Sequence, residues 1–390
     1  MLANADGALE MTLARGAGRI TLTAGDHQIS RKVPQEVFTS GRTTVVADLF
    51  GDDVAALHTG TVALGIRQVL CAPLRLVRYR ARGEAPVEPR NIGVLYMDSR
   101  ERGTLLSVEA RVSLDALAGQ AAIAIENARL YQETVEKARV DEELMMASAI
   151  QQALLPESRR SGRFYEAVGA SVPSRTIGGD FFDYQDLGEL GFGFGLGDVM
   201  GKGPPAALLT SLVQGVLATH AFTPTMPDEV VTFLNRILLA RRLESRFVTL
   251  FLAVLAPDGR LTFCNAGQNP PLLVTAAGVT RLETGGTIVG AFADAVYERG
   301  QAQLAPGDTL VVFSDGVVEA EDPHRNPFGD DGVLAAVRAA PDRSVSRALG
   351  ERDSADAVLD SLFGAVRAFT RGAPLRDDLT ALVIRYRSPS

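Results

Sequence analysis

A stretch without glycine or proline runs from Gln120 to Leu155, and it constrains the fold of this chain more than any other feature. The stretch is rich in Ala, Glu, Gln and Arg, which favour helix. A helix from about Val112 to Leu155 would be about 60 Å long, at roughly 1.5 Å per residue. Because a helix this long separates the residues on its two sides, we expect three regions: a domain at residues 1–115, a helical linker at 112–158 and a second domain at 160–390.

Apolar residues in this helix recur at alternating steps of four and three, which is the seven-residue period of a coiled coil. The seam comprises Leu117, Ala121, Ala124, Ala128, Tyr131, Val135 and Ala138, and resumes after Glu142 with Met145 and Ala149. Two interpretations are open: a parallel homodimer seam, or one amphipathic helix packed on its own domains. We favour the dimer, because so long a helix has little of its own protein to bury against.

The flanking regions carry β-rich runs. In the first region we expect strands at 17–24, 43–46, 69–79 and 92–97, which is typical of a mixed α/β domain. In the third region we expect strands at 167–172, 181–187, 192–197, 247–255, 261–265, 272–275, 309–313 and 380–386. Helices are expected there at 205–220, 228–242 and 355–370. Runs of strands with helices clustered between and after them predict an α+β fold, a sheet sandwich with helices outside.

Charge and composition exclude several classes of protein. A net charge of −8 argues against a nucleic-acid-binding face, which needs clustered basic residues. Cys71 and Cys264 lie in apolar runs of different domains, so we expect buried, reduced thiols in a cytoplasmic protein. The apolar run 247–256 is about half the length of a membrane span, and the N-terminus does not resemble a signal peptide.

Four short aspartate-containing segments lie in order after the helix. They are GGDFFDY at 178–184, GDVMGKG at 197–203, FSDGVVEA at 313–320 and DDLT at 377–380. Each lies at the end of a strand-like run, and carboxylates on glycine-rich turns are typical ligands of Mg²⁺ or Mn²⁺. A single Asp-Gly pair is usually only a turn. Four in order predict a carboxylate cage for divalent cations.

Within the segments, some aspartates fit this role better than others. Asp180 comes after two glycines that let the backbone approach closely, whereas Asp183 would face the opposite side of a strand. Asp198 can bridge two cations, and the carbonyl of Val199 can add a ligand. Asp315 completes the set with either Asp377 or Asp378. The lysine of GKG does not make a nucleotide-binding loop, because the Gly-x(4)-Gly-Lys-Ser/Thr pattern is absent.

Such a cage fits metal-assisted hydrolysis. Two cations about 3.5–4 Å apart would clamp phosphate oxygens and activate a bridging water for in-line attack on phosphorus. The histidines are scattered, which argues against a Ser-His-Asp hydrolase.

The order of GGDFFDY, GDVMGKG, FVTLFLAVL, AGQNPPLL, FSDGVVEA and DDLTALVIR resembles the PPM metal-dependent serine/threonine phosphatases, most closely their bacterial SpoIIE/RsbU branch. The resemblance covers nearly all of 163–387 and implies a β-sandwich flanked by helices with two Mn²⁺ or Mg²⁺ ions. The ligands and catalytic residues it implies are Asp180, Asp198, the carbonyl of Val199, Asp315 and Asp377, with Asp378 as a rival for the last place. Met200 and Gln268 depart from the family pattern, at positions where a small residue and His are common.

The helical and N-terminal regions carry further resemblances. Ala147–Pro156 is similar to the helix that precedes this phosphatase domain and is linked to its switching, with Ile150 and Leu154 packing on the catalytic domain. Residues 66–76, 91–99 and 114–133 resemble a GAF sensor domain, although little sequence precedes Ala8 for its usual opening helix.

These resemblances imply a GAF-regulated phosphatase in stress or sigma-factor signalling. Its substrate would be a phosphoserine or phosphothreonine protein, by analogy an anti-sigma-factor antagonist, and it would act as a cytoplasmic homodimer. A catalytically silent signalling scaffold is the alternative, against which the intact aspartate set argues. A GAF-linked nucleotide cyclase would leave the SDG and DDLT segments unexplained.

Overall fold

The computed structural model describes residues 1–4, 6–16, 20–22, 31–47, 49, 65–76, 89–101, 107–220, 226–241, 246–340 and 354–388. The chain forms two compact units, Met1–Arg139 and Val140–Ser390. The boundary falls inside the longest helix, within the range 112–158 that the sequence assigned to a linker. No helix in the described part of the chain is both long and apolar enough to cross a membrane.

The first unit is built on an antiparallel sheet of five strands in the order β2-β1-β5-β4-β3. Its elements are β1 (Leu2–Ala3), β2 (Leu9–Glu10), α1 (Lys32–Ser40), β3 (Thr44–Val46), β4 (Gln68–Leu76), β5 (Arg90–Ser99) and the long helix α4 (Val108–Leu154). The strands predicted at 43–46, 69–79 and 92–97 are therefore confirmed. The strand predicted at 17–24 lies mostly outside the described residues.

Strand β4 alternates between two apolar layers because successive side chains point to opposite faces. Leu70 and Leu74 pack with Leu114 and Ala118 of α4, whereas Cys71 packs on the other side with Val37 of α1. The thiol of Cys71 is fully buried, and this burial raises its pKa to about 12. Among the described residues, α4 thus covers one face of the N-terminal sheet and α1 the other.

Beyond its contact with this sheet, helix α4 buries little of its surface. Leu114, Ala118 and Ala122 are its only buried residues among those described. Leu117, Tyr131, Val135 and Met145 of the predicted seam are between 50% and 71% exposed. These four seam residues are therefore not covered by the part of the chain that the structure describes, whereas Ala121 packs against the core of the N-terminal sheet.

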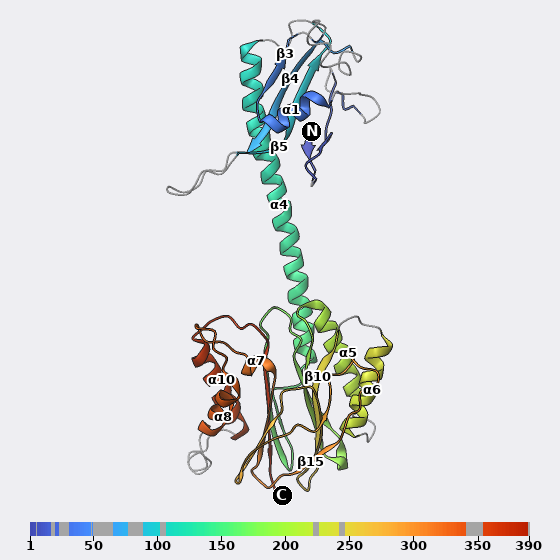
Figure 1. Cartoon of the computed structure of the whole chain (residues 1–390), viewed down its shortest axis with the longest axis vertical. Helices are drawn as coiled ribbons and strands as arrows, with labels where there is room; N and C mark the ends of the chain where they lie inside the picture. Colours follow the sequence, from blue (N-terminus) through green and yellow to red (C-terminus); the bar gives the residue numbers. More distant parts are fainter. Residues whose placement is uncertain are drawn as a thin grey trace. The chain divides into compact units, whose positions relative to one another are not determined.

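The second unit is a sandwich of two six-stranded sheets with helices on both outer faces (Figure 1). One sheet has the path β14-β11-β10-β9-β8 with β15 paired to β11, and the other has the order β13-β12-β16-β17-β7-β6. Its strands are β6 (Arg159–Ser161), β7 (Tyr165–Val172), β8 (Phe181–Asp186), β9 (Phe192–Val199), β10 (Val248–Leu255), β11 (Arg260–Ala266), β12 (Leu272–Thr275), β13 (Gly278–Arg281), β14 (Gly285–Gly286), β15 (Gly300–Gln303), β16 (Thr309–Phe313) and β17 (Leu379–Tyr386). Its helices are α5 (Pro204–His220), α6 (Pro227–Ala240), α7 (Asp315–Val318), α8 (Gly329–Ala339) and α10 (Ser354–Thr370), with a 3₁₀ turn at Gly188–Leu190.

Three apolar clusters hold these four layers together. Phe182, Phe194 and Phe251 of one sheet meet Leu310 and Leu382 of the other in the central cluster. The outer face of the β8–β11 sheet packs on α5 and α6, and that of the β16–β17 sheet packs on α8 and α10. The predicted α+β sandwich with helices outside is confirmed, as are its eight predicted strands and three predicted helices.

Candidate metal centre

Two aspartates lie where β8 and β9 meet the loops at one end of the sandwich. Asp180 immediately precedes β8, and Asp198 is the next-to-last residue of β9. The strands pair antiparallel with Phe181 opposite Gly197, so Asp180 and Asp198 are neighbours across the pair. We call them the first pair.

Glycine is required beside the first pair, because other chain atoms occupy the space a side chain would need. A Cβ on Gly179 would lie 2.6 Å from the carbonyl oxygen of Val199 and 3.0 Å from Oδ1 of Asp198. The carbonyl of Gly201 is 3.3 Å from the same point. Three oxygens therefore converge on a hollow that exists only because residue 179 has no side chain.

In the first pair Asp180 is buried and Asp198 is half-buried, and their carboxylates repel each other. Burial, followed by the charge of Asp198, raises the pKa of Asp180 well above its usual range. Burial, followed by the charge of Asp315, raises the pKa of Asp198 to about 7. Oδ2 of Asp180 is buried without a hydrogen-bond partner among the described residues. Such an orphaned oxygen is costly unless something else satisfies it.

The second sheet brings Asp315 and Asp377 to the same place, and we call these the second pair. Asp315 begins α7 directly after β16, and Asp377 lies just before β17, which pairs antiparallel with β16. Gly316 is required here, since a Cβ would lie 2.0 Å from the carbonyl oxygen of Asp378. Burial, followed by the charge of Asp377, raises the pKa of Asp315.

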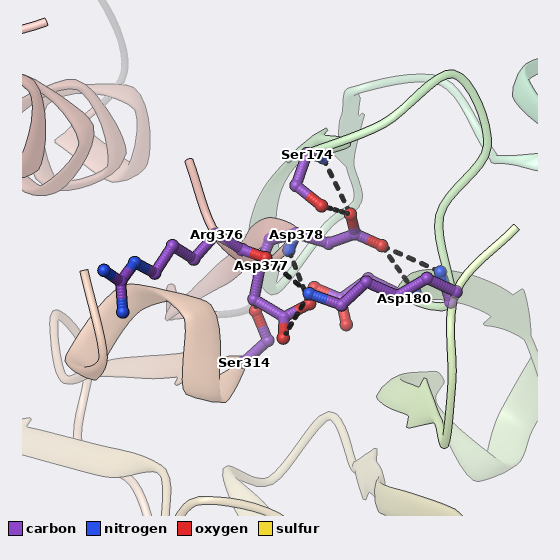
Figure 2. A network of polar contacts seen from close by, with 8 residues as sticks. Ser174, Asp180, Ser314, Arg376, Asp377 and Asp378 are labelled. Atoms are coloured by element: carbon purple, nitrogen blue, oxygen red, sulfur yellow. Dashed lines mark hydrogen bonds and ion pairs between the residues drawn. The ribbon is translucent and has the colours of Figure 1, made fainter. Parts of the chain in front are cut away.

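Asp377 and Asp378 have different surroundings, although they are adjacent in sequence (Figure 2). The carboxylate of Asp378 is buried and accepts hydrogen bonds from the backbone N–H of Ser174 (2.7 Å), the hydroxyl of Ser174 (3.0 Å) and the N–H of Gly179 (2.8 Å). A longer bond of 3.4 Å comes from the N–H of Asp180. Asp378 therefore fixes the loop that carries Asp180, and its oxygens are already occupied.

Asp377 keeps its carboxylate open to the other acids. Its side chain is 37% exposed, and its Oδ2 lies 2.9 Å from Nζ of Lys202. Its Oδ1 accepts a hydrogen bond from the N–H of Asp378 at 2.9 Å. Lys202, in the GKG segment, also donates to the carbonyl of Arg376, so its ammonium joins the β9–α5 loop to the DDLT segment.

The four carboxylates of Asp180, Asp198, Asp315 and Asp377, which we call the acidic cluster, form a row of neighbours. Asp198 raises the pKa of Asp180, Asp315 raises that of Asp198, and Asp377 raises that of Asp315. In this structure the carboxylates are not drawn together around a common point: the described ranges contain no group of three Asp, Glu, His or Cys side chains close enough to hold one metal ion. The donor set still suits hard cations, because it is all oxygen and includes an unsatisfied buried carboxylate oxygen.

Asp183 does not take part in the cluster. It lies within β8, where its Oδ1 accepts a hydrogen bond from the N–H of Tyr184, and burial raises its pKa to about 6. Its place matches the expectation that Asp180 and Asp183 face opposite ways.

Gln268, one of the two departures from the family pattern, joins the two sheets behind the cluster. Its Nε2 donates to the carbonyl of Phe313 at 3.2 Å, and its Oε1 accepts from the hydroxyl of Thr249. Thr249 pairs with Asp198 across β9 and β10, and Phe313 is two residues before Asp315. Met200, the other departure, is 41% exposed and lies outside these contacts.

Sequence reasoning missed the contacts of Gln151 near the end of α4. Its Nε2 donates to the carbonyl of Gly178 at 2.8 Å, and the N–H of Gly178 donates to its Oε1 at 3.2 Å. The helix is thus hydrogen-bonded to the glycine pair that precedes Asp180. The only available signal was that Gln151 falls within the segment Ala147–Pro156.

Fold and site together define a sandwich with an all-oxygen acidic cluster at one end, which is the pattern of the PPM phosphatases. The family model described as Stage II sporulation protein E (SpoIIE) matches residues 189–387, more than half of the chain. The chain belongs to the SpoIIE family, as its motifs predicted.

Two curated relatives extend the comparison. Phosphoserine phosphatase RsbU of Bacillus subtilis is 30% identical over 183 residues, covering 46% of this chain and 54% of RsbU. Protein IcfG of Synechocystis sp. is 27% identical over 227 residues, covering 50% of this chain and 36% of IcfG. The chain therefore spans about half or less of the length of these relatives.

A solved structure supports the fold. The SiaA-PP2C domain of Pseudomonas aeruginosa superposes with a TM-score of 0.53 at 21% sequence identity, covering 64% of this chain and 98% of that domain. At this identity the likeness bears on the fold alone.

Proposed function

We propose that this chain is a metal-dependent phosphoprotein phosphatase that hydrolyses phosphoserine or phosphothreonine. The observation that carries this proposal is the acidic cluster, in which four carboxylates from two sheets lie close enough that their charges raise the pKa values of Asp180, Asp198 and Asp315. Without cations such a cluster only costs stability, because buried like charges repel. With cations it becomes a site for phosphate chemistry.

We assign Asp180, Asp198, Asp315 and Asp377, together with the carbonyl of Val199, as the ligands of two Mn²⁺ or Mg²⁺ ions. When bound, such ions would polarise a phosphate ester and activate a water molecule for attack on phosphorus. Asp377 is preferred over Asp378 because the oxygens of Asp378 are already engaged by Ser174 and Gly179. Asp378 is instead a positioning residue that holds Asp180 in place.

The chain's own residues account for the rest of the chemistry. Gly179 leaves the hollow in which the carbonyl of Val199 faces the first pair. Lys202 places a positive charge beside Asp377, where it could attract a phosphate dianion. Cys264 is fully buried, and this burial raises its pKa to about 12, as it does for Cys71, so neither thiol is placed to act as a nucleophile.

The substrate class is inferred from the family and from RsbU, whose name describes a phosphoserine phosphatase. We propose that the substrate is a phosphorylated signalling protein, by analogy an anti-sigma-factor antagonist in partner-switching or stress signalling.

Regulation would come from the N-terminal region. We propose that residues 1–115 form a GAF-like sensor, and that α4 carries its signal to the catalytic domain at 160–390. The two hydrogen bonds between Gln151 and Gly178 support this route, because a shift of the end of α4 would move the backbone two residues before Asp180. The uncovered seam of Leu117, Tyr131 and Met145 supports a homodimer with a parallel coiled coil.

Phosphate release by the full-length protein tests the proposal. An aryl phosphate and a phosphoserine peptide would each be assayed in EDTA, Mg²⁺ and Mn²⁺, with an Asp198→Ala variant alongside. We expect turnover that requires metal and is lost in the variant. Turnover that survives both EDTA and the substitution would contradict the proposal. Metal binding without turnover of either substrate would instead favour a catalytically silent scaffold.

A further inference from the structure

A cleft of about 530 Å³ opens beside the acidic cluster on the α7–α10 side of the second unit. One wall is the segment 319–327, which connects α7 to α8, and the other is the segment 370–377, which connects α10 to β17. The cleft shares Asp377 with the acidic cluster, and Gly316, next to Asp315, also lines it. The cleft therefore directly adjoins the acidic cluster.

An ion pair spans the cleft and gives it a defined shape. Nη1 of Arg376 lies 2.8 Å from Oε1 of Glu321 on the opposite wall. Arg376 immediately precedes Asp377, so this contact joins the cleft to the acidic cluster. The remaining lining includes Pro323, Pro327 and Leu375, and the two prolines leave the wall that carries them little freedom to move.

Most of the carboxylates that line the cleft are already engaged. Glu321 is paired with Arg376, and Asp377 is paired with Lys202. Oδ1 of Asp322 accepts hydrogen bonds from the N–H groups of His324 (2.8 Å) and Asn326 (2.9 Å). Its Oδ2 accepts from the side-chain amide of Asn326, and these bonds lower the pKa of Asp322. The charges of Glu321 and Asp377 are thus offset by cations, whereas Asp322 and Glu319, the fourth carboxylate of the lining, keep their negative charges.

Arg325 is the cation that remains available. It lines the cleft and is exposed, and no residue in the described ranges forms an ion pair or side-chain hydrogen bond with its guanidinium. Its backbone has a φ of 68°, a left-handed conformation that non-glycine residues rarely adopt. The turn around Asp322 holds it there, through the bond from the N–H of Arg325 to the carbonyl of Asp322 (2.9 Å). The guanidinium is thus carried by a preformed loop.

We propose that this cleft is a substrate-specificity site that binds an acidic side chain of the phosphoprotein, next to its phosphorylated serine. Arg325 provides the principal contact, because a guanidinium matches a carboxylate with two parallel hydrogen bonds. This inference rests on the proposed phosphatase function and adds to it the sequence that the enzyme prefers around the phosphoserine. Phosphoproteins with Asp or Glu close to the phosphoserine are the favoured substrates.

The test uses the full-length protein and phosphoserine peptides in which one Glu is moved through the positions flanking the phosphoserine. Matched peptides carry Gln or Lys at the same positions. Each peptide's kcat/KM is divided by that of an aryl phosphate, so that changes at the metal centre cancel. At one or more positions we expect the Glu peptide to exceed its Gln partner by up to about fivefold, the most that an exposed ion pair usually contributes.

The variant Arg325→Glu should remove this preference and shift it toward the Lys peptide. Arg371→Glu is the matched control, because Arg371 is also exposed, also has a positive φ of 51° and does not line the cleft. We expect this control to keep the preference of the natural chain. No preference for Glu at any position, or equal effects of the two substitutions, would overturn the assignment.

Failure of the proposed function would have a different signature. If neither the aryl phosphate nor any peptide is hydrolysed, the phosphatase assignment fails. The proposed binding site in the cleft is then tested by calorimetry, which gives the dissociation constants of the same peptides. Tighter binding of Glu peptides that Arg325→Glu abolishes would support the cleft, and equal binding of Glu, Gln and Lys peptides would overturn it.

Discussion

The first and second pairs of the acidic cluster differ in how far each is open to solvent. Asp180 is buried and Asp198 is half-buried where β8 and β9 meet the loops, and their pKa values are raised mainly by burial, as is the pKa of Asp315 in the second pair. Asp377 of the second pair is 37% exposed and matched by the ammonium of Lys202. The second pair is therefore the more open of the two, because its outer member, Asp377, is partly exposed and lies beside a lysine. We infer that the open side, which continues into the cleft with Arg325, is where substrate approaches.

Removing the central carboxylate of the first pair should have the largest effect. Asp198→Ala should lower the metal-dependent kcat/KM by at least about 1,000-fold, equivalent to about 4 kcal/mol of transition-state stabilisation. Steady-state kinetics at saturating Mn²⁺ provide the measurement. Asp183→Asn is the matched control, because the carboxylate of Asp183 bonds only to the N–H of Tyr184 among the described residues. A similar loss in both variants would mean that the effect is on folding rather than on the cluster.

Exchanging Asp377 and Asp378 one at a time for asparagine should distinguish the residue that positions Asp180 from the residue that binds metal. Asp378→Asn should lower the free energy of unfolding in EDTA by about 2–3 kcal/mol, since an amide cannot accept all of the hydrogen bonds from Ser174 and Gly179. Asp377→Asn should change it by less than about 1 kcal/mol, because its ion pair is partly exposed. Urea denaturation measures both. The opposite ranking would make Asp378 the better candidate for a metal ligand.

The raised pKa of the first pair predicts a pH dependence for the metal-free protein. The folded pKa of Asp198 is about 7, above its unfolded value of 3.8, so between these values the folded state keeps a proton that the unfolded state has lost. This contribution to stability is present at low pH and is lost as the pH rises toward 7, by up to about 1.4 kcal/mol per pH unit. Denaturation in EDTA from pH 5 to 8 should show a shallower decline for Asp198→Asn. Parallel curves for the two proteins would contradict the burial of this carboxylate.

The smallest effect is expected at the open side. Lys202→Gln removes the cation that competes for Asp377, and should tighten Mn²⁺ binding by up to about fivefold at low salt. The gain should shrink at higher ionic strength, because exposed charges are screened. Calorimetric titration of Mn²⁺ measures this, with Lys202→Arg retaining the charge as a control. Weaker binding in Lys202→Gln would show that the lysine supports the site rather than competing for it.

The strands and helices that carry strong apolar patterns could be predicted from the sequence, and weakly patterned ones could not. Helix α8 begins with Gly329, Asp330 and Asp331, and helix α7 has only four residues, so neither has a clear helical period. Strand β15, with the sequence GQAQ at 300–303, lacks the alternation of a half-buried strand, and its place depends on pairing with β11. These elements form because tertiary contacts favour them, which local propensity does not record.

The proximity of the four aspartates follows from the sequence, because each lies at or next to the end of a strand with a strong pattern. Their role as metal ligands stays a prediction. The difference between Asp377 and Asp378 depends on which carboxylate meets the loop at Ser174, a contact across more than 200 positions of sequence. The contacts of Gln268 with Thr249 and Phe313 likewise depend on how the two sheets stack.

The most direct test of the account is whether the acidic cluster holds two metal ions side by side. Mn²⁺ would be titrated into the full-length protein, with its stoichiometry measured by calorimetry and its electron paramagnetic resonance spectrum recorded at saturation. The account predicts two ions per chain with an exchange-coupled spectrum, as expected for ions about 4 Å apart, and loss of that coupling in Asp198→Ala. One ion per chain, or two that give only uncoupled signals, would contradict it.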